Sequence, residues 1–194
     1  MDPEGNTGGH VVNALKWLDR NIGFFDLNEQ DKQSLYWAVL LHDIGKPLTD
    51  PAEFPRHAGH DALGGKLLRT NFCDRLKLPS RTAKLCRFVC ENHMKFHYFP
   101  EMRKATKFDF IFDIYNRTEK KPALFIAACL ADGYCNRSDD GWKKDFADFS
   151  DIVSAVCEQS LRIRLTEDEI AAIPPERRAD ALRLKRLNAL SDIL

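Results

Sequence analysis

Histidine and aspartate side chains gather in one part of this 194-residue chain, where they could bind a metal ion. His42 is followed directly by Asp43 at the end of the apolar segment 34–41, and Asp132 ends the apolar segment 122–132. An ionised carboxylate is costly to bury without a partner. Imidazole and carboxylate groups together suit divalent first-row metal ions. Two aspartates at the ends of buried helices therefore predict a cation between them.

The other histidines have spacings that favour the same site. The six histidines of the chain are His10, His42, His57, His60, His93 and His97. The pair at 57 and 60 and the pair at 93 and 97 have helical spacings, so each pair shares one helix face. Neighbours such as His42 and Asp43 diverge by about 100° on a helix, and they can share a cation only near its end. A single histidine is more often a surface or hydrogen-bonded residue, but the combination favours a metal site.

The elements that must position these residues are predicted to be helices, so the fold class is all-α. Helices are expected over about 9–19, 28–43, 57–72, 79–97, 106–116, 122–132, 141–164, from 166 to the prolines at 174–175, and 176–192. Thr7 and Asn28 are candidate N-caps, and Thr166 with Glu169 has the spacing of a capping box. Segment 106–116 favours helix over strand, and the proline-containing segment 47–56 is expected to be a loop.

The chain is expected to divide near residue 140 into a main domain, 1–140, and a C-terminal helical extension, 141–194. Every histidine precedes this boundary, and a charged amphipathic segment follows it. Basic residues of the segment are nearly balanced by acidic ones, so a solvated helical face is favoured over an RNA-binding patch. The apolar face of the extension could pack on the main domain or on a second chain, which leaves a homodimer open.

The overall composition is that of a globular protein without a general attraction to nucleic acid or membranes. The formal net charge is zero, 44% of the residues are hydrophobic and 30% are charged. No segment approaches the roughly 20 apolar residues of a membrane-spanning helix, and the polar start does not resemble a signal peptide. The six cysteines are expected to be reduced core residues of a cytoplasmic protein. Cys86 and Cys90, four residues apart, leave a soft-metal site as the less favoured alternative.

The order of these motifs resembles a known family. His10, then His42-Asp43 within HDIGK, then Asp132 match the H…HD…D pattern of the HD-domain superfamily of metal-dependent phosphohydrolases. TGGH (7–10), LLHDIGKPLT (40–49), FPRHAGHDALGGKLL (54–68) and ENHMKFHYFP (91–100) are similar to the C-terminal HD domain of bacterial multifunctional CCA-adding enzymes. That domain carries 2′,3′-cyclic phosphodiesterase, 2′-nucleotidase and phosphatase activities. The similarity covers about residues 5–138 and is weaker in the tail.

The resemblance implies a metal site and a helical HD bundle with an extension. The implied ligands of one divalent ion are His10, His42, Asp43 and Asp132, while His60 and His93 match ligands of a second ion in binuclear members. Nickel, manganese, cobalt or magnesium would fit, as one ion or two, and would activate a water for hydrolysis. The implied catalytic residues are Asp43 and Lys46. The implied phosphate contacts are Lys46, Arg56 and Arg137, although Lys46 could be only a cation at a helix C-terminus.

The chain departs from this family in two places. Nothing in it resembles the nucleotidyltransferase half, so CCA addition is not predicted. The arginine-rich turn that often follows the last aspartate is GYCNR here, and only Arg137 remains. His57 and His97 could contact substrate or only solvent. Phe96, Tyr98 and Phe99 could stack on a base but are more often core residues.

The expected reaction is therefore hydrolysis of 2′,3′-cyclic nucleotides and 2′-phosphomonoesters, as free nucleotides or at RNA ends, tRNA included. Other HD nucleotidase activities, such as 5′-nucleotidase or dinucleoside polyphosphate hydrolase, remain alternatives. A non-catalytic tRNA-binding module and a regulatory nucleotide-binding domain are further alternatives. An intact set of ligands favours the enzyme.

Overall fold

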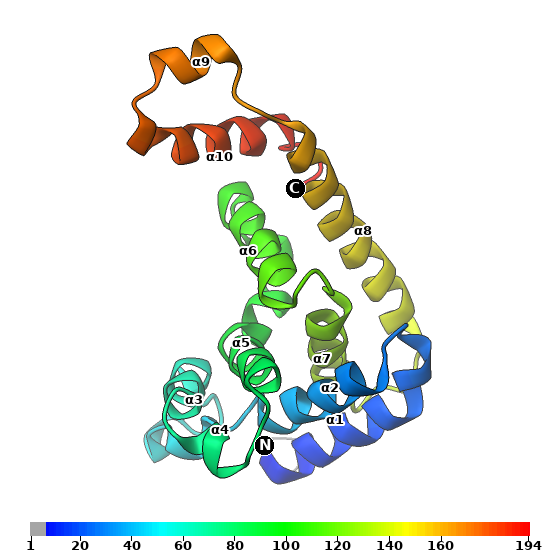
Figure 1. Cartoon of the computed structure of the whole chain (residues 1–194). Coiled ribbons are helices and arrows are strands. Elements are labelled where there is room, and N and C mark those ends of the chain that lie inside the picture. Colours follow the sequence, from blue (N-terminus) through cyan, green and yellow to red (C-terminus); the bar gives the residue numbers. More distant parts are fainter. Residues whose placement is uncertain (1–6) are drawn as a thin grey trace.

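A computed structural model describes residues 7–194, and all regular elements in this range are helices (Figure 1). The α-helices are α1 (Thr7–Asn21), α2 (Glu29–Leu41), α3 (His60–Leu68), α4 (Phe72–Arg75), α5 (Ser80–His97), α6 (Lys104–Arg117), α7 (Ala123–Tyr134), α8 (Gly141–Arg162), α9 (Glu167–Ala172) and α10 (Arg178–Ala189). Short 3-10 turns cover Ile22–Phe24, Lys46–Leu48, Pro51–Glu53, Phe99–Glu101 and Pro175–Arg177. The prediction of an all-α fold is confirmed. None of the described helices is both long and apolar enough to cross a membrane.

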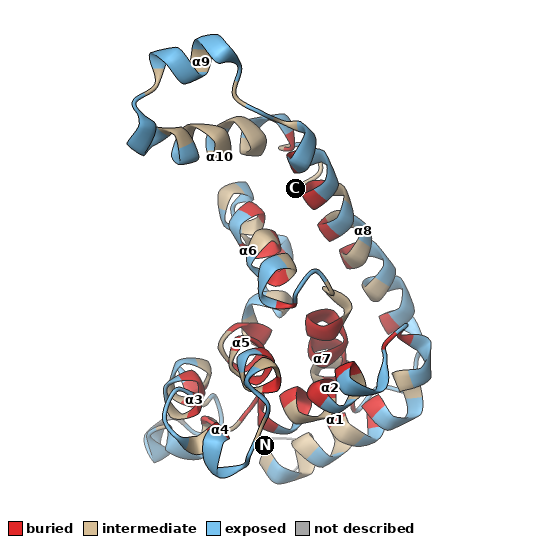
Figure 2. Cartoon of the chain, in the orientation of Figure 1, coloured by how far each residue is buried: buried red, intermediate tan, exposed pale blue. Residues whose placement is uncertain are grey.

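Helix α7 lies at the centre of the main bundle. Its residues 124–131 are all buried, and α1, α2, α5 and α8 pack around it (Figure 2). A helix that is apolar on every side is stable in water only when neighbours cover it on every side. The end of α7 therefore delivers Asp132 into the middle of the bundle.

The cysteines belong to this core. All six are buried, and none of them forms a disulfide within residues 7–194. Burial raises the pKa of Cys86 and of Cys90 to about 12, so both stay protonated at neutral pH. The prediction that they are packing residues is confirmed.

An ion-pair cluster joins the start of α2 to α5 and to the turn before α7. The side chain of Asn28 caps α2 by accepting from the amide of Asp31, as predicted. The buried carboxylate of Asp31 lies 2.7 Å from Arg81 and 2.5 Å from Lys121. Burial opposes ionisation of this carboxyl, but Lys121 and Arg81 outweigh burial and lower its pKa.

Replacing this carboxylate should destabilise the chain. We expect Asp31→Asn to lower the free energy of unfolding by about 2–3 kcal/mol at pH 7, because two cations lose their buried partner. Since the folded pKa is lowered, the stabilisation is present above the unfolded value near 3.9 and is lost as pH falls through the folded pKa. Urea unfolding at pH 7 and in acid measures both effects.

Glu119→Gln is the control for this prediction. The carboxylate of Glu119 contacts the same Arg81 at 2.8 Å but is 60% exposed, so its loss should cost less than about 1 kcal/mol. Equal losses in the two variants would show that burial of Asp31 contributes nothing.

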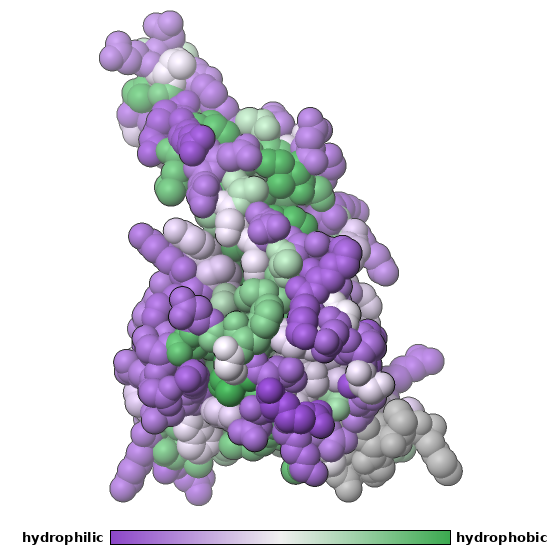
Figure 3. Space-filling model, turned by 90° about the vertical axis from the view of Figure 1, so that its right-hand side faces the viewer, coloured by the Kyte–Doolittle hydropathy of each residue, from purple (hydrophilic) through white to green (hydrophobic). Residues whose placement is uncertain are grey.

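The extension is joined to the rest of the molecule through α8. This helix packs on α7 and α6, while α9 and α10 form a hairpin at its far end (Figure 1). Basic residues of the hairpin pair with carboxylates: Arg183 contacts Asp109 at 2.5 Å, and Lys185 contacts Glu169 at 2.6 Å. The surface in this region is largely hydrophilic with apolar patches between (Figure 3). A solvated charged face fits these pairs, and the division at residue 140 stays a prediction.

Several helix ends differ from the expected ones. The helix expected over 57–72 is two helices, α3 and α4, and α3 begins only at His60. His57 and Gly59 have positive φ angles of 49° and 75°, so the chain turns sharply before α3 and a helix cannot start earlier. The expected loop 47–56 contains two 3-10 turns. Thr7 is the first described residue of α1, so its predicted role as a cap stays a prediction, whereas the capping box of Thr166 and Glu169 is present.

Candidate metal centre

Five helices bring histidine and aspartate side chains together beside the end of α7. His10 comes from α1, His42 and Asp43 directly follow α2, His60 starts α3, His93 lies on α5 and Asp132 on α7. These side chains form two groups of three in which the candidate ligand atoms lie within 4.8 Å of one another. One group is His10, His42 and Asp132, and the other is Asp43, His60 and His93.

The first group converges on the carboxylate of Asp132. Nε2 of His10 lies 2.8 Å from Oδ1 of Asp132, and Nε2 of His42 lies 3.6 Å from the same oxygen. The two Nε2 atoms are 3.3 Å apart. Three potential donor atoms therefore face a common point.

The second group converges on the carboxylate of Asp43. Nε2 of His60 and Nε2 of His93 lie 3.2 and 3.6 Å from Oδ1 of Asp43 and 3.1 Å from each other. The other oxygen, Oδ2, faces the first group, at 3.3 Å from His42 and 3.7 Å from His10. Asp43 thus joins the two groups into one continuous cluster.

Backbone carbonyl groups fix the orientation of three of these imidazole rings. Nδ1 of His42 is 2.7 Å from the carbonyl of Val39, and Nδ1 of His60 is 2.9 Å from that of His57. Nδ1 of His93 is 3.0 Å from the carbonyl of Cys90. A carbonyl only accepts, so each Nδ1 carries the proton and donates it, and Nε2 of a neutral ring presents its lone pair to the cluster. Histidine ligands of metal ions are commonly held in this way.

The charges of the cluster also fit a bound cation. Asp43 is buried, and neither of its carboxylate oxygens accepts a hydrogen bond of normal geometry from the described residues, although the ammonium of Lys46 lies 2.6 Å from Oδ2. Burial keeps His93 neutral by lowering its pKa to about 4. Nε2 of His93 therefore presents a lone pair, and Nε2 of His60 lies 3.1 Å from it and 3.2 Å from Oδ1 of Asp43, so the three atoms surround a point that fits a shared cation.

Positive charge is favoured in the first group. Burial disfavours protonation of His10 and His42, but the nearby carboxylate of Asp132 and, for His42, also that of Asp43 raise their pKa values to about 11 and about 10. Burial opposes ionisation of Asp132 and Asp43, and the surrounding imidazoles outweigh it and lower both pKa values. The two carboxylates therefore attract positive charge, which a divalent ion would supply in place of the protons.

His97 belongs to the edge of this cluster. Its Nε2 lies 2.8 Å from Oδ2 of Asp132, on the side of the carboxylate that faces away from His10. The sequence left its role open, although its spacing from His93 placed both on one face of α5. His57 lies apart, where its Nδ1 donates to the hydroxyl of Thr49 at 2.8 Å and its carbonyl accepts from His60. It supports a ligand candidate and does not face the cluster.

The three cationic residues expected to contact phosphate lie in different surroundings. Lys46 pairs with Asp43 inside the cluster. Arg137 is exposed after α7, with its guanidinium 4.5 Å from the centre of the Tyr134 ring. Arg56 is exposed on the loop before α3, and within residues 7–194 no hydrogen bond or ion pair links it to the cluster. The structure thus brings only Lys46 to the candidate ligands.

Sequence reasoning missed one neighbour of the cluster, Cys135. Its Sγ lies 3.6 Å from Nδ1 of His10 and 3.3 Å from the carbonyl of Asp132. The sequence could have indicated this contact, because Cys135 lies three residues after Asp132 and so near it on the same helical turn. The pair Cys86 and Cys90 takes part in neither group that could hold a metal ion in the described part of the chain.

Comparison with known families agrees with this geometry. The model of the HD domain family matches residues 9–137, a segment that contains every candidate ligand of the cluster. The chain belongs to the HD-domain family. HD domains are metal-dependent phosphohydrolases, and the His/Asp cluster of this HD domain supplies groups that could hold divalent metal ions. The predicted family and enzyme class are confirmed.

Relatives of this HD domain carry the name "Multifunctional CCA protein". That of Ectopseudomonas mendocina is 37% identical over 133 residues, which are 67% of this chain and 30% of the relative. That of Alkalilimnicola ehrlichii is 35% identical over 132 residues, again 67% of this chain and 30% of the relative. That of Pseudomonas syringae pv. syringae is 29% identical over 190 residues, 97% of this chain and 43% of the relative. The chain thus spans less than half of the length of these relatives. No solved structure gives a significant match to it.

Proposed function

We propose that this HD domain hydrolyses 2′,3′-cyclic nucleotides and 2′-phosphomonoesters. The observation that carries the metal-dependent chemistry is the buried carboxylate of Asp43, which lies between two sets of histidines and lacks a normal hydrogen bond within residues 7–194. The substrate class is supported by similarity to multifunctional CCA proteins, whose HD domains the sequence motifs resemble. The same phosphate chemistry at the end of an RNA, tRNA included, is part of the proposal.

The proposed ligands follow the two groups of the cluster. His10, His42, Asp43 and Asp132 would hold one divalent ion, and His60 and His93 would hold a second ion beside Asp43. Nickel, manganese, cobalt and magnesium are the candidates, because imidazole nitrogen suits nickel and cobalt and carboxylate oxygen suits manganese and magnesium. When bound, such an ion supplies Lewis acidity toward phosphoryl oxygens and toward water.

The remaining chemistry belongs to the side chains around the cluster. Asp43 would accept a hydrogen bond from the attacking water and so orient it, since its carboxylate is fixed between both groups. Lys46, with its ammonium beside Asp43, would offset negative charge on the phosphate during the reaction. We propose Arg137 and Arg56 as further phosphate contacts, because a guanidinium binds phosphate oxygens in a bidentate manner.

A metal-exchange assay tests the proposal. We expect chelation to abolish hydrolysis of 2′,3′-cyclic AMP and 2′-AMP, and addition of Mg²⁺, Mn²⁺, Co²⁺ or Ni²⁺ singly to restore it for at least one ion. Products would be separated by chromatography, because opening of a cyclic phosphate frees no phosphate, with 3′-AMP and 5′-AMP as comparison substrates. Cleavage of 5′-AMP alone would refute the substrate class. Metal binding without any turnover would favour a non-catalytic RNA-binding or regulatory module.

A further inference from the structure

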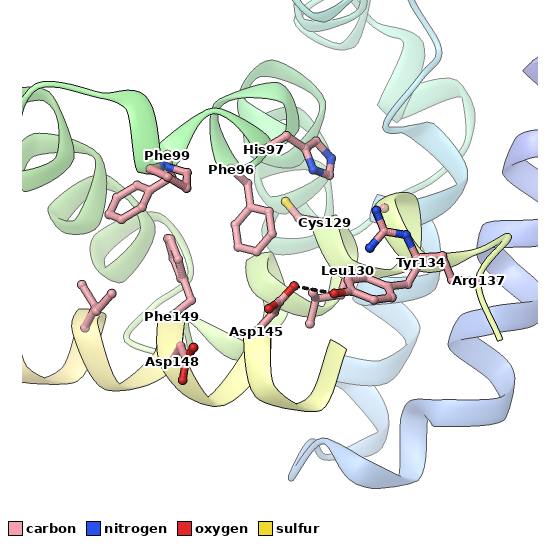
Figure 4. Close-up of a pocket in the computed structure, with 13 residues that line it drawn as sticks. Phe96, His97, Phe99, Cys129, Leu130, Tyr134, Arg137, Asp145, Asp148 and Phe149 are labelled. Carbon is pink, nitrogen blue, oxygen red and sulfur yellow. Dashed lines mark hydrogen bonds between the residues drawn. The ribbon is translucent and has the colours of Figure 1, made fainter. Parts of the chain in front are cut away.

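A cavity of about 330 Å³ lies beside the cluster, between the end of α5, α7 and α8 (Figure 4). Its walls are mainly apolar and include Phe96, Phe99, Leu130, Phe149 and Ile152. The rings of Phe96 and Phe149 lie 4.9 Å apart, centre to centre. The volume falls within the range of about 300–1,000 Å³ that is usual for small-molecule sites.

The cavity and the metal centre share His97. This residue lines the cavity, and its Nε2 lies 2.8 Å from Oδ2 of Asp132. Gly133 allows this arrangement, because a Cβ at that position would come within 3.1 Å of Cε1 of His97. His97 is therefore the residue at which the cavity wall meets the cluster.

The charged groups of the cavity lie on two sides, one acidic and one basic, which suit different parts of a ligand. Asp145 and Asp148 of α8 line one side, where Asp145 accepts a hydrogen bond of 2.5 Å from the hydroxyl of Tyr134. The guanidinium of Arg137 lies over the Tyr134 ring, 4.5 Å from its centre (Figure 4). Carboxylates repel a phosphate and accept from hydroxyl or amino groups, whereas the guanidinium attracts a phosphate. An uncharged ring system with polar edges fits the α8 side of the cavity.

We propose that this cavity is the nucleoside subsite of the enzyme, which rests on the proposed function for its phosphate chemistry. The base packs among Phe96, Phe149 and Ile152, and the α8 carboxylates accept hydrogen bonds from the sugar hydroxyls or the amino group of the base. The phosphate then lies toward His97 and the cluster. Tyr98, which the sequence grouped with its phenylalanine neighbours as a stacking candidate, is 54% exposed and does not line the cavity.

This subsite gives the extension a role in substrate selection. Asp145, Asp148, Phe149 and Ile152 all lie on α8, which follows the segment 9–137 that matches the HD family. The family segment provides the candidate metal ligands, and the extension provides one wall of the nucleoside subsite. Selection of the nucleoside would thus depend on residues outside the matched domain.

Kinetics with and without a base test this subsite. We expect Phe149→Ala to lower kcat/KM for 2′-AMP about tenfold, which is the loss of one base–aromatic stack, mainly through KM. Hydrolysis of ribose 2-phosphate, which has no base, should not change. Phe146→Ala is the matched control on the same helix, since that ring packs on Phe24 and Phe25 and does not line the cavity. It should leave the ratio of the two substrates at its wild-type value.

Adenosine binding provides a measurement that needs no turnover. Calorimetric titration of the full metal-loaded chain should show binding that Phe149→Ala weakens about tenfold or more and Phe146→Ala does not. Ile152→Trp, which enlarges a partly buried side chain of the cavity wall and so obstructs the cavity, should abolish binding. This variant carries the test if Phe149→Ala lowers the melting temperature severely.

The proposed function and the proposed nucleoside subsite can be refuted separately. Adenosine binding that is sensitive to these variants, without hydrolysis of any phosphoester, would refute the proposed function and support the subsite. Hydrolysis of 2′-AMP and ribose 2-phosphate with equal kcat/KM, together with no adenosine binding, would overturn the subsite and leave the proposed function standing.

Discussion

Asp43→Asn is expected to lower the rate of phosphoester hydrolysis by about 10³-fold or more. This loss is equivalent to about 4 kcal/mol of transition-state stabilisation. The carboxylate of Asp43 is the one group shared by both halves of the cluster, with Oδ1 facing His60 and His93 and Oδ2 facing His42. An amide of the same shape keeps one oxygen but loses the charge and places an NH₂ group where a cation would be held. Both halves of the site are therefore weakened by one substitution.

Metal content and circular dichroism separate this loss from unfolding. We expect the Asp43→Asn variant to retain its helical signal and to bind less divalent metal after dialysis than the parent chain. Asp61→Asn is the control, because that carboxylate lies beside His60 but accepts a local hydrogen bond from the amide of Ala62 at 2.8 Å. Its activity and metal content should stay near those of the parent. Full activity of Asp43→Asn would refute the proposed role of this carboxylate.

Patterns among residues close in the chain predicted most of the helices. The cap at Asn28, the capping box at Thr166 and the apolar run of α7 depend on residues close in the chain, and all three were found where expected. The predicted start of this helix at residue 57 was wrong, because α3 begins only at His60. The positive φ angles at His57 and Gly59 are set by the packing of the loop before it. A histidine with a positive φ angle cannot be recognised from the spacing of apolar residues that predicts a helix.

The candidate site was predictable to the level of residue types but not of geometry. A buried helix that ends in His42-Asp43, and another that ends in Asp132, required a positive partner whatever the rest of the fold. How the histidines divide between the two aspartates depends on the packing of α3 and α5 against α2, which no spacing encodes. The contact of His97 with Asp132 likewise requires the end of α5 to lie across α7. The cavity wall from α8 comes from a segment whose charge pattern indicated only a solvated face.

The loop that carries Asp43 is held against α3 by an unusually close backbone approach at Gly45. A Cβ at this position would lie 1.9 Å from the carbonyl oxygen of His60 and 2.5 Å from the amide nitrogen of Gly64. Gly45 has a φ of −83°, which any residue can adopt, so the need for glycine comes from space alone. The contact fixes the distance between the segment after Asp43 and the start of α3, where His60 lies.

Gly45→Ala should therefore damage both stability and the metal centre. We expect a loss of about 3 kcal/mol or more in the free energy of unfolding, because backbone atoms of two elements must separate to admit the methyl group. Separation would also move His60 away from Oδ1 of Asp43, now 3.2 Å from its Nε2, and weaken metal binding. Urea unfolding and a metal titration of the folded variant measure the two effects.

Gly23→Ala is the matched control for this substitution. A Cβ on Gly23 would meet no atom within 4 Å, so the free energy of unfolding should change by less than about 1 kcal/mol and metal binding should stay the same. If Gly45→Ala proved as stable as Gly23→Ala and bound metal as tightly, the loop after α2 would have room to move. The close approach could then not be what sets the distance between Asp43 and His60.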